Sequence, residues 1–133
     1  MKEVDAKTAY AALSDQADAI LVDCRTKAEW MLIGGADLSG IDKQPVMVEW
    51  QSMDGRLNSE FCHKIRDVAD EDAPIFVLCR VGGRSATAAQ ALLDDGFTDV
   101  TNITDGFEGP VNDEGHRSKV AGWRAQGLPW RQS

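Results

Sequence analysis

Short apolar runs alternate along the chain with segments in which apolar residues recur every three or four positions. The runs at 19–22 (AILV) and 75–78 (IFVL) contain no polar residue, which is typical of strands buried on both faces of a parallel sheet. Helical spacing is present at 6–13, 58–68 and 86–95. Strands that alternate with helices predict an α/β fold, with a parallel sheet covered by helices on both faces.

Weaker signals predict the remaining elements. Val4 is expected in a short first strand, the alternating segment 45–50 in a more exposed strand, and 99–103 in the last strand. The sequence TKAE at 26–29 matches a capping box, which predicts a short helix there. A terminal helix is expected over 118–125.

Composition indicates a globular protein with an acidic surface. A length of 133 residues fits one domain, 1–133, and 43% of the residues are hydrophobic. The net charge of −8 argues against nucleic acids and anionic membranes as partners. The chain has no apolar stretch long enough to span a membrane, and its acidic N-terminal segment is unlike a signal peptide. Three widely spaced cysteines without C-x-x-C spacing predict reduced thiols in the cytoplasm and no metal site.

The segment 75–87 (IFVLCRVGGRSAT) carries the strongest functional signal. Cys79 ends an apolar strand and precedes the adjacent glycines 82–83, which permit backbone angles that turn N–H groups inward to bind an anion. The following helix adds the positive end of its dipole, and Arg80 and Arg84 add charge. We therefore predict that Cys79 is an accessible nucleophile, largely thiolate near neutral pH. The alternative is an inert buried thiol.

Several other residues are predicted at the same edge of the sheet, because the carboxyl ends of parallel strands meet there. Asp23, Arg25 and Glu29 are interpreted as a partly buried charge network. Cys24 is interpreted as a small core residue, with a resolving thiol as the alternative. Cys62 is also predicted in the core. Trp50, Trp123 and Trp130 are predicted to pack in the fold rather than to line a donor pocket.

These motifs resemble those of bacterial single-domain rhodanese-like sulfurtransferases. The segment 21–25 followed by Glu29-Trp30 is similar to an early Asp-x-Arg signature of that family, and 79–85 resembles its active-site loop. Residues 105–109, together with Trp123 and 127–130, resemble its closing segment. The resemblance implies a rhodanese-like α/β fold, with a five-stranded parallel sheet and helices on both faces.

The resemblance also implies a ping-pong reaction. The Cys79 thiolate takes a sulfane sulfur from a donor, thiosulfate or a persulfide, and passes it from a persulfide to a thiol or cyanide-like acceptor. No cofactor is predicted, and Ser85 is interpreted as a helix cap.

Two positions depart from the family pattern. Val81 stands where thiosulfate-using members can carry a lysine. Many members also have a histidine after the Glu-aromatic pair, and none follows Glu29-Trp30 here. The residues implied to form the loop wall and bind substrate are Arg80, Val81, Gly82, Gly83, Arg84 and Ser85.

Two rival functions use similar motifs. Cysteine phosphatases and arsenate reductases place five residues between cysteine and arginine, whereas four separate Cys79 from Arg84, so a tetrahedral phosphate should fit poorly. A non-catalytic or carrier domain that acts through protein–protein binding is the second rival, although such domains typically lose the cysteine.

A cysteine protease needs a histidine beside the thiol, and His63 and His116 are predicted at the surface. Arg84 is expected to bind a sulfonate or phosphate oxygen through its planar guanidinium.

Overall fold

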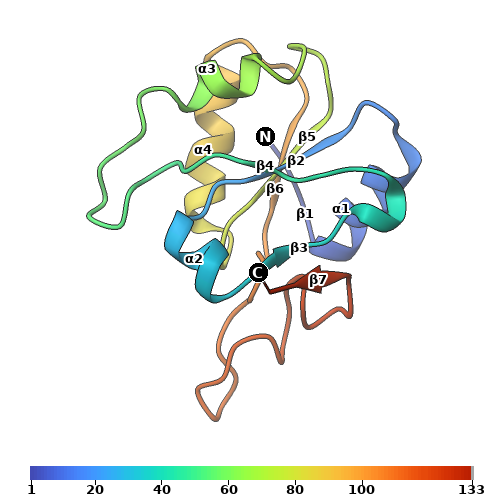
Figure 1. The fold of residues 1–133 in the computed structure, drawn as a ribbon, viewed down its shortest axis with the longest axis vertical. Coiled ribbons are helices and arrows are strands. Elements are labelled where there is room, and N and C mark those ends of the chain that lie inside the picture. The colour runs from blue at the N-terminus through green and yellow to red at the C-terminus, as the bar shows by residue number, and fades with distance from the viewer. Residues whose placement is uncertain (133) are drawn as a thin grey trace.

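The computed structural model describes residues 1–132 and contains a five-stranded parallel sheet with helices on both faces (Figure 1). The strand order is β1-β6-β5-β2-β4, and every neighbouring pair is parallel, which confirms the predicted fold class. The strands of this sheet are β1 (Lys2–Val4), β2 (Ile20–Asp23), β4 (Val46–Met47), β5 (Ile75–Leu78) and β6 (Val100–Ile103).

Two helices, α1 (Ala6–Asp15) and α2 (Lys27–Leu32), begin at side-chain caps. The Asp5 side chain accepts a hydrogen bond from the Thr8 N–H and so caps α1. Thr26 and Glu29 form the predicted capping box at the start of α2. The helical segments of residues 1–132 are α1 (Ala6–Asp15), α2 (Lys27–Leu32), α3 (Phe61–Arg66), α4 (Gly83–Asp94) and the short 3₁₀ helix η1 (Ser39–Ile41).

Alternate residues of β5 enter two separate hydrophobic cores. Phe76 and Leu78 belong to the core that includes α1 and the C-terminal segment. Ile75, Val77 and Cys79 belong to the opposite core, which contains residues of α3 and α4. This alternation follows from the period of two along a strand, and it places Cys79 on the face of the sheet that α4 covers.

The segment 118–125 forms no helix, contrary to the prediction. Its backbone bonds to a distant turn instead: the Trp123 N–H donates to Gly106 O (2.8 Å) and the Arg124 N–H to Phe107 O (3.2 Å). The chain then forms β7 (Trp130–Arg131), which pairs antiparallel with β3 (Gly35–Ala36). In this segment, hydrogen bonds to distant parts of the chain therefore prevail over the local preference for a helix.

Two further predictions are wrong in extent. The strand expected over 45–50 is reduced to β4, and the helix expected over 58–68 is reduced to α3. In α3 only Phe61 and Ile65 are buried, and Cys62, predicted in the core, is half-buried and packs against that core from outside. The first strand, the last strand and α4 lie close to their predicted positions.

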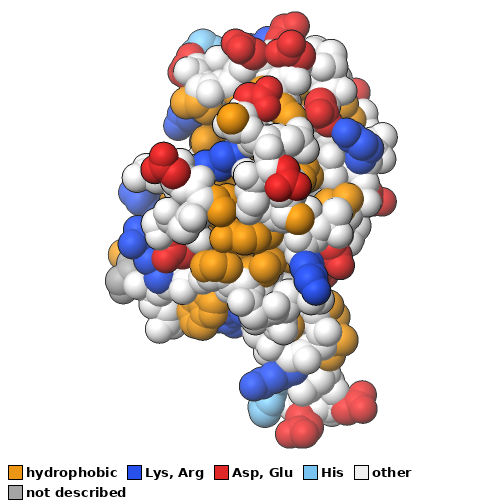
Figure 2. All heavy atoms as spheres, turned by 90° about the vertical axis from the view of Figure 1, so that its right-hand side faces the viewer, with side chains coloured by type: hydrophobic (Ala, Val, Ile, Leu, Met, Phe, Trp, Pro, Cys, Tyr) orange, Lys and Arg blue, Asp and Glu red, His pale blue; other side chains and the backbone are white. Residues whose placement is uncertain are grey.

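Acidic, basic and apolar side chains all reach the face shown in Figure 2. Acidic side chains gather at its upper and lower ends, and an apolar group lies between them. The acidic ends agree with the net charge of −8. Within residues 1–132, no helix is long and apolar enough to cross a membrane.

Candidate active site

Cys24 and Cys79 lie side by side at the carboxyl ends of two neighbouring strands. Asp23 of β2 pairs in register with Leu78 of β5, and the Cys24 N–H donates to Leu78 O (2.9 Å). The two thiols follow this pair directly and belong to the same hydrophobic core. Topology therefore brings them together, as the parallel-sheet argument predicts.

Cys79 is less accessible than the sequence predicts. Only 1% of its surface is exposed, because its side chain lies on the covered face of the sheet beneath the loop that joins β5 to α4. The loop is itself held by the turn that follows β6. The Phe107 N–H donates to Cys79 O (2.8 Å), and the Glu108 N–H donates to Arg80 O (3.0 Å). The cysteine thus lies in a fixed and largely covered position.

One loop N–H group contacts the sulfur directly. The Gly82 N–H donates to Cys79 Sγ over 3.1 Å. Gly82 has a φ of 101° and occupies the N-cap position of α4, so the sulfur also lies near the free N–H groups of a helix start. A donor at this distance stabilises negative charge on sulfur, which is the role predicted for the loop.

Ser85 is not the helix cap, because Gly82 holds that position. The Ser85 hydroxyl lies 3.2 Å from Cys79 Sγ and donates to Asn102 Oδ1 over 2.5 Å. Asn102 in turn donates from Nδ2 to Glu3 Oε2 (3.1 Å) and to Gly82 O (3.2 Å). Asn102 is therefore a site residue that motif reasoning missed. It lies far along the chain from Cys79, so only the pairing of β5 with β6 brings it close.

The Asn102 contacts determine which way the Ser85 proton points. Two acceptors fix Nδ2 of Asn102, so its Oδ1 faces Ser85 and receives the single hydroxyl proton. Ser85 Oγ is then left to accept from the S–H of Cys79. Ser85 thus links the Cys79 sulfur to Asn102 through one hydroxyl group.

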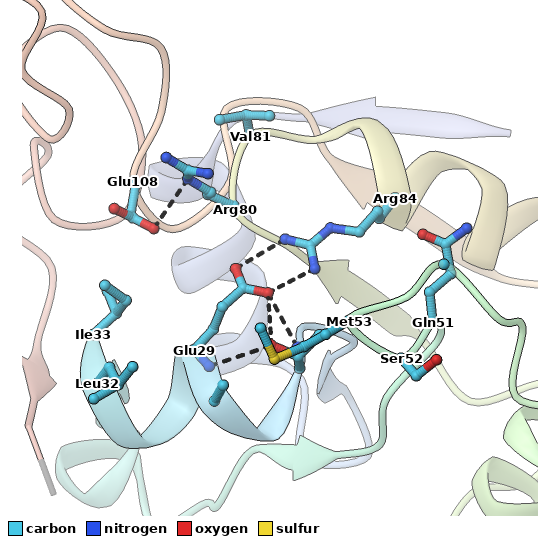
Figure 3. A pocket seen from close by; sticks show the side chains of 13 residues that line it. Glu29, Leu32, Ile33, Gln51, Ser52, Met53, Arg80, Val81, Arg84 and Glu108 are labelled. Atoms are coloured by element: carbon cyan, nitrogen blue, oxygen red, sulfur yellow. Dashed lines mark hydrogen bonds and ion pairs between the residues drawn. The ribbon is translucent and has the colours of Figure 1, made fainter.

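Both loop arginines are paired with carboxylates (Figure 3). Arg84 donates from Nη1 and Nη2 to the two oxygens of Glu29, over 2.7 and 2.9 Å. Arg80 Nε lies 3.4 Å from Oε2 of Glu108. The predicted positive spot is therefore neutralised, and Arg84 is already engaged by a carboxylate of the protein. Sequence reasoning did not find these pairs, because each joins separate segments of the chain.

The predicted charge network is divided between two sites. Asp23 and Arg25 form a buried pair, with Arg25 Nη2 donating to Asp23 Oδ2 over 2.7 Å. Glu29 takes no part in that pair and binds Arg84. The two pairs hold different elements: one fixes the end of β2, and the other ties α2 to the active-site loop.

Cys24 has the environment of an inert thiol. It is fully buried, and burial raises the pKa of the Cys24 thiol well above its usual value. The neighbouring Cys79 and Asp23 raise this pKa further, and the charge of Arg84 opposes them only in part. Cys24 should therefore stay protonated at neutral pH, which supports its interpretation as a core residue.

The Glu29–Arg84 pair makes stability depend on pH. Burial alone would raise the pKa of Glu29, but hydrogen bonds from Arg84 and Thr26 lower it from 4.5 to about 2. A lowered pKa in the folded state gives stability that is complete above the unfolded value and is lost as pH falls towards the folded one. We expect Glu29→Gln to lower the free energy of unfolding by about 1–3 kcal/mol at pH 7 and by roughly half of that, or less, at pH 3.

Urea denaturation at the two pH values measures this difference. Glu60→Gln is the matched control, since Glu60 is exposed and begins the neighbouring helix rather than the site. A Glu29→Gln effect of equal size at pH 7 and pH 3 would contradict the ion pair.

The adjacent glycines of the loop have unequal roles. An ideal Cβ on Gly82 would lie 2.8 Å from the carbonyl carbon of Thr104, whereas a Cβ on Gly83 would meet nothing within 4 Å. Gly82 also has a positive φ, which an alanine adopts only with strain. We expect Gly82→Ala to lower the free energy of unfolding by about 1–3 kcal/mol, and Gly83→Ala to leave it nearly unchanged. Thermal unfolding of the two variants tests this, and equal effects would argue against the loop geometry.

A pocket of about 640 Å³ opens over the active-site loop. Its lining includes the loop residues Arg80, Val81 and Arg84, together with residues of α2 and of the 51–57 turn (Figure 3). Cys79 lies beneath this loop and is not itself part of the lining. Within residues 1–132, no group of three or more acidic, histidine or cysteine side chains is placed to hold a metal ion.

The tryptophans are engaged in packing. Trp123 is fully buried edge-on against Tyr10, and Trp50 packs edge-on against Phe61. Trp130 lies in β7, and its ring is covered by an arginine. The lining of the pocket over the loop, as far as residues 1–132 form it, is made by other side chains. These contacts support the packing interpretation.

Comparison with known proteins identifies the family. The sequence matches the STR4 middle domain over residues 2–133. The crystal structure of Rv0390 from M. tuberculosis is similar with a TM-score of 0.92 and 43% identity, covering 100% of this chain and 98% of that one. Uncharacterized protein RC0915 of Rickettsia conorii is 35% identical over 125 residues, which are 92% of this chain and 91% of that protein.

One similar plant protein is named as rhodanese-like. Rhodanese-like domain-containing protein 4, chloroplastic, of Arabidopsis thaliana is 29% identical over 127 residues, which are 94% of this chain and 24% of the plant protein. This match, the parallel sheet and the cysteine loop between β5 and α4 agree with one another. The chain therefore belongs to the STR4 middle-domain family and has a rhodanese-like fold.

Proposed function

We propose that this protein is a sulfurtransferase that carries a sulfane sulfur as a persulfide on Cys79. The observation that carries the proposal is the Gly82 N–H, which lies 3.1 Å from Cys79 Sγ in the loop between a parallel strand and a helix start. Such a donor stabilises sulfur that bears negative charge before and after transfer. Membership of a rhodanese-like family supports the same chemistry.

Each half of the proposed reaction exchanges one sulfur–sulfur bond for another. The Cys79 thiolate attacks the sulfane sulfur of the donor, a new bond forms between the two sulfurs, and the donor's bond breaks with release of its remaining thiolate or sulfite. An acceptor thiolate then attacks the outer sulfur, and the electron pair of the broken bond returns to Cys79. No electrons are gained or lost overall. The loop residues Arg80 to Ser85 enclose the outer sulfur in this proposal.

Phosphate transfer is less well supported by the geometry. An arginine that binds phosphate must have free N–H groups, and Arg84 directs two of its nitrogens to Glu29. His63 and His116, the chain's histidines, are both exposed, so neither is placed as a general base beside Cys79.

Intact mass spectrometry tests the proposal. Reduced protein is incubated with inorganic polysulfide, thiosulfate or an organic persulfide, and the gain of one sulfur atom per chain is expected with at least one of them. Hydrolysis of a generic aryl phosphate is measured on the same preparation as the competing activity. Efficient phosphate hydrolysis without sulfur uptake would overturn the proposal.

A further inference from the structure

Three exposed apolar side chains surround the entrance to the pocket over the active-site loop. Leu32 of α2 is 77% exposed, Met53 of the 51–57 turn is 81% exposed and Val81 of the loop is 43% exposed. We call these three residues the apolar collar. They come from separate segments of the chain, and Figure 3 shows the side chains of all three at the pocket. Large apolar groups left open to water around one pocket indicate a binding surface.

The charged groups of the pocket cancel one another. Arg84 is held by Glu29 through two hydrogen bonds, and Arg80 is paired with Glu108. All four residues belong to the lining. The pocket therefore offers two cations and two anions that are already paired, and an incoming dianion such as thiosulfate would have to displace a carboxylate to gain an arginine. An uncharged molecule meets no such competition.

Met53 is held in place by a formed turn. Gln51 and Leu57 form an antiparallel bridge, the Ser52 N–H donates to Arg56 O (2.9 Å), and the Gly55 N–H donates to Ser52 O (2.9 Å). The turn thus presents a flexible thioether side chain from a defined backbone position. Methionine adapts its shape to irregular apolar ligands, which suits recognition of a hydrocarbon chain.

From these observations we infer that the sulfur acceptor of Cys79 is an uncharged aliphatic thiol whose hydrocarbon part contacts the apolar collar. The inference rests on the proposed sulfurtransferase function and deepens it by naming the substrate class. The thiolate of the acceptor attacks the outer sulfur of the Cys79 persulfide, its proton having gone to water. The products are the acceptor's persulfide and the Cys79 thiolate. A volume of about 640 Å³ is ample for a chain of several carbons beside the loop.

A chain-length series tests the substrate class. The protein is loaded with sulfur from inorganic polysulfide and freed of excess reagent, and transfer is then followed in single turnover with mercaptoethanol, mercaptobutanol and mercaptohexanol. These thiols share a neutral hydroxyl end and differ in hydrocarbon length. A fully buried methylene is worth about fourfold in affinity, so partial burial should raise the second-order rate constant by about tenfold or more from the shortest to the longest thiol.

Two variants locate the effect. Met53→Gln keeps the length of the side chain but makes it polar, and it should flatten the dependence of the transfer rate on chain length. Met47→Gln is the matched control, since Met47 is an exposed methionine of β4 outside this pocket. It should leave the chain-length dependence as it is in the unchanged protein.

The outcomes separate the inference from the function on which it rests. If no donor places sulfur on Cys79, the proposed function fails. If sulfur is loaded and transferred at rates that do not depend on chain length, or if Met53→Gln behaves like Met47→Gln, the proposed function stands and the substrate class is wrong. Faster transfer to longer thiols that is lost in Met53→Gln supports the inference.

Discussion

Replacing Cys79 with serine is expected to abolish sulfur uptake. The serine hydroxyl is not ionised at neutral pH and needs an adjacent base to act as a nucleophile. The groups nearest the Cys79 sulfur are the Gly82 N–H and the Ser85 hydroxyl, neither of which is such a base. Intact mass spectrometry after incubation with polysulfide should therefore show one added sulfur on the unchanged protein and none on Cys79→Ser.

The other two cysteines provide the controls. Cys24→Ala and Cys62→Ala should both take up one sulfur, because Cys79 and its Gly82 N–H contact are present in both variants. Burial raises the pKa of Cys24 well above its usual value, and burial also raises that of Cys62. Alanine is preferred to serine at Cys24, because this position is fully buried and a serine hydroxyl there could not hydrogen-bond to water. Sulfur found on Cys79→Ser would reassign the nucleophile.

The parts of the fold that the sequence predicts well are those determined by local patterns. The runs 19–22 and 75–78 are apolar because β2 and β5 are buried in the sheet. Asp18 and Asp23 bound the first run, and Pro74 precedes the second. The capping box at 26–29 predicts α2 for a similarly local reason, since both of its hydrogen bonds lie within one turn. These features need no knowledge of the rest of the chain.

Long-range contacts explain what the sequence does not reveal. The segment 118–125 has helical spacing, yet its N–H groups bond to Gly106 and Phe107 instead of to its own carbonyls. In the site, the sequence position of Arg84 predicts a guanidinium that is free to bind substrate, and only the fold reveals that Glu29 binds it. Spacing in one segment cannot encode a partner that another segment supplies.

The depth of Cys79 shows the same limit. Its strand end, adjacent glycines and following helix all suggest an open thiol, but a hydrogen-bonded turn from the end of β6 closes the loop above it. Asn102 reaches Ser85 from β6 through sheet pairing. The choice of Cys79 as the candidate nucleophile thus rests on local information, whereas its accessibility and its hydrogen-bond partners depend on the topology of the sheet.

Removing the carboxylate of Asp23 should destabilise the protein more than most single substitutions. Asp23 and Arg25 are 1% and 0% exposed, and Asp23 accepts from Nε (3.0 Å) and Nη2 (2.7 Å) of Arg25. Asp23→Ala leaves the guanidinium buried, with Gly34 O and the ring of Phe107 as its remaining contacts. An unpaired buried charge lowers the free energy of unfolding by about 3–5 kcal/mol, to be measured by urea denaturation.

The double variant Asp23→Ala/Arg25→Met separates the ion pair from simple packing. Removing both charges also removes the desolvation penalty of the unpaired guanidinium, and methionine retains part of the contact with Phe107. We therefore expect the double variant to be more stable than Asp23→Ala alone, although each single substitution destabilises. If the two losses instead add, the carboxylate and the guanidinium act independently. Arg25 Nη1, which has no hydrogen-bond partner within residues 1–132, adds to the advantage of removing the charge.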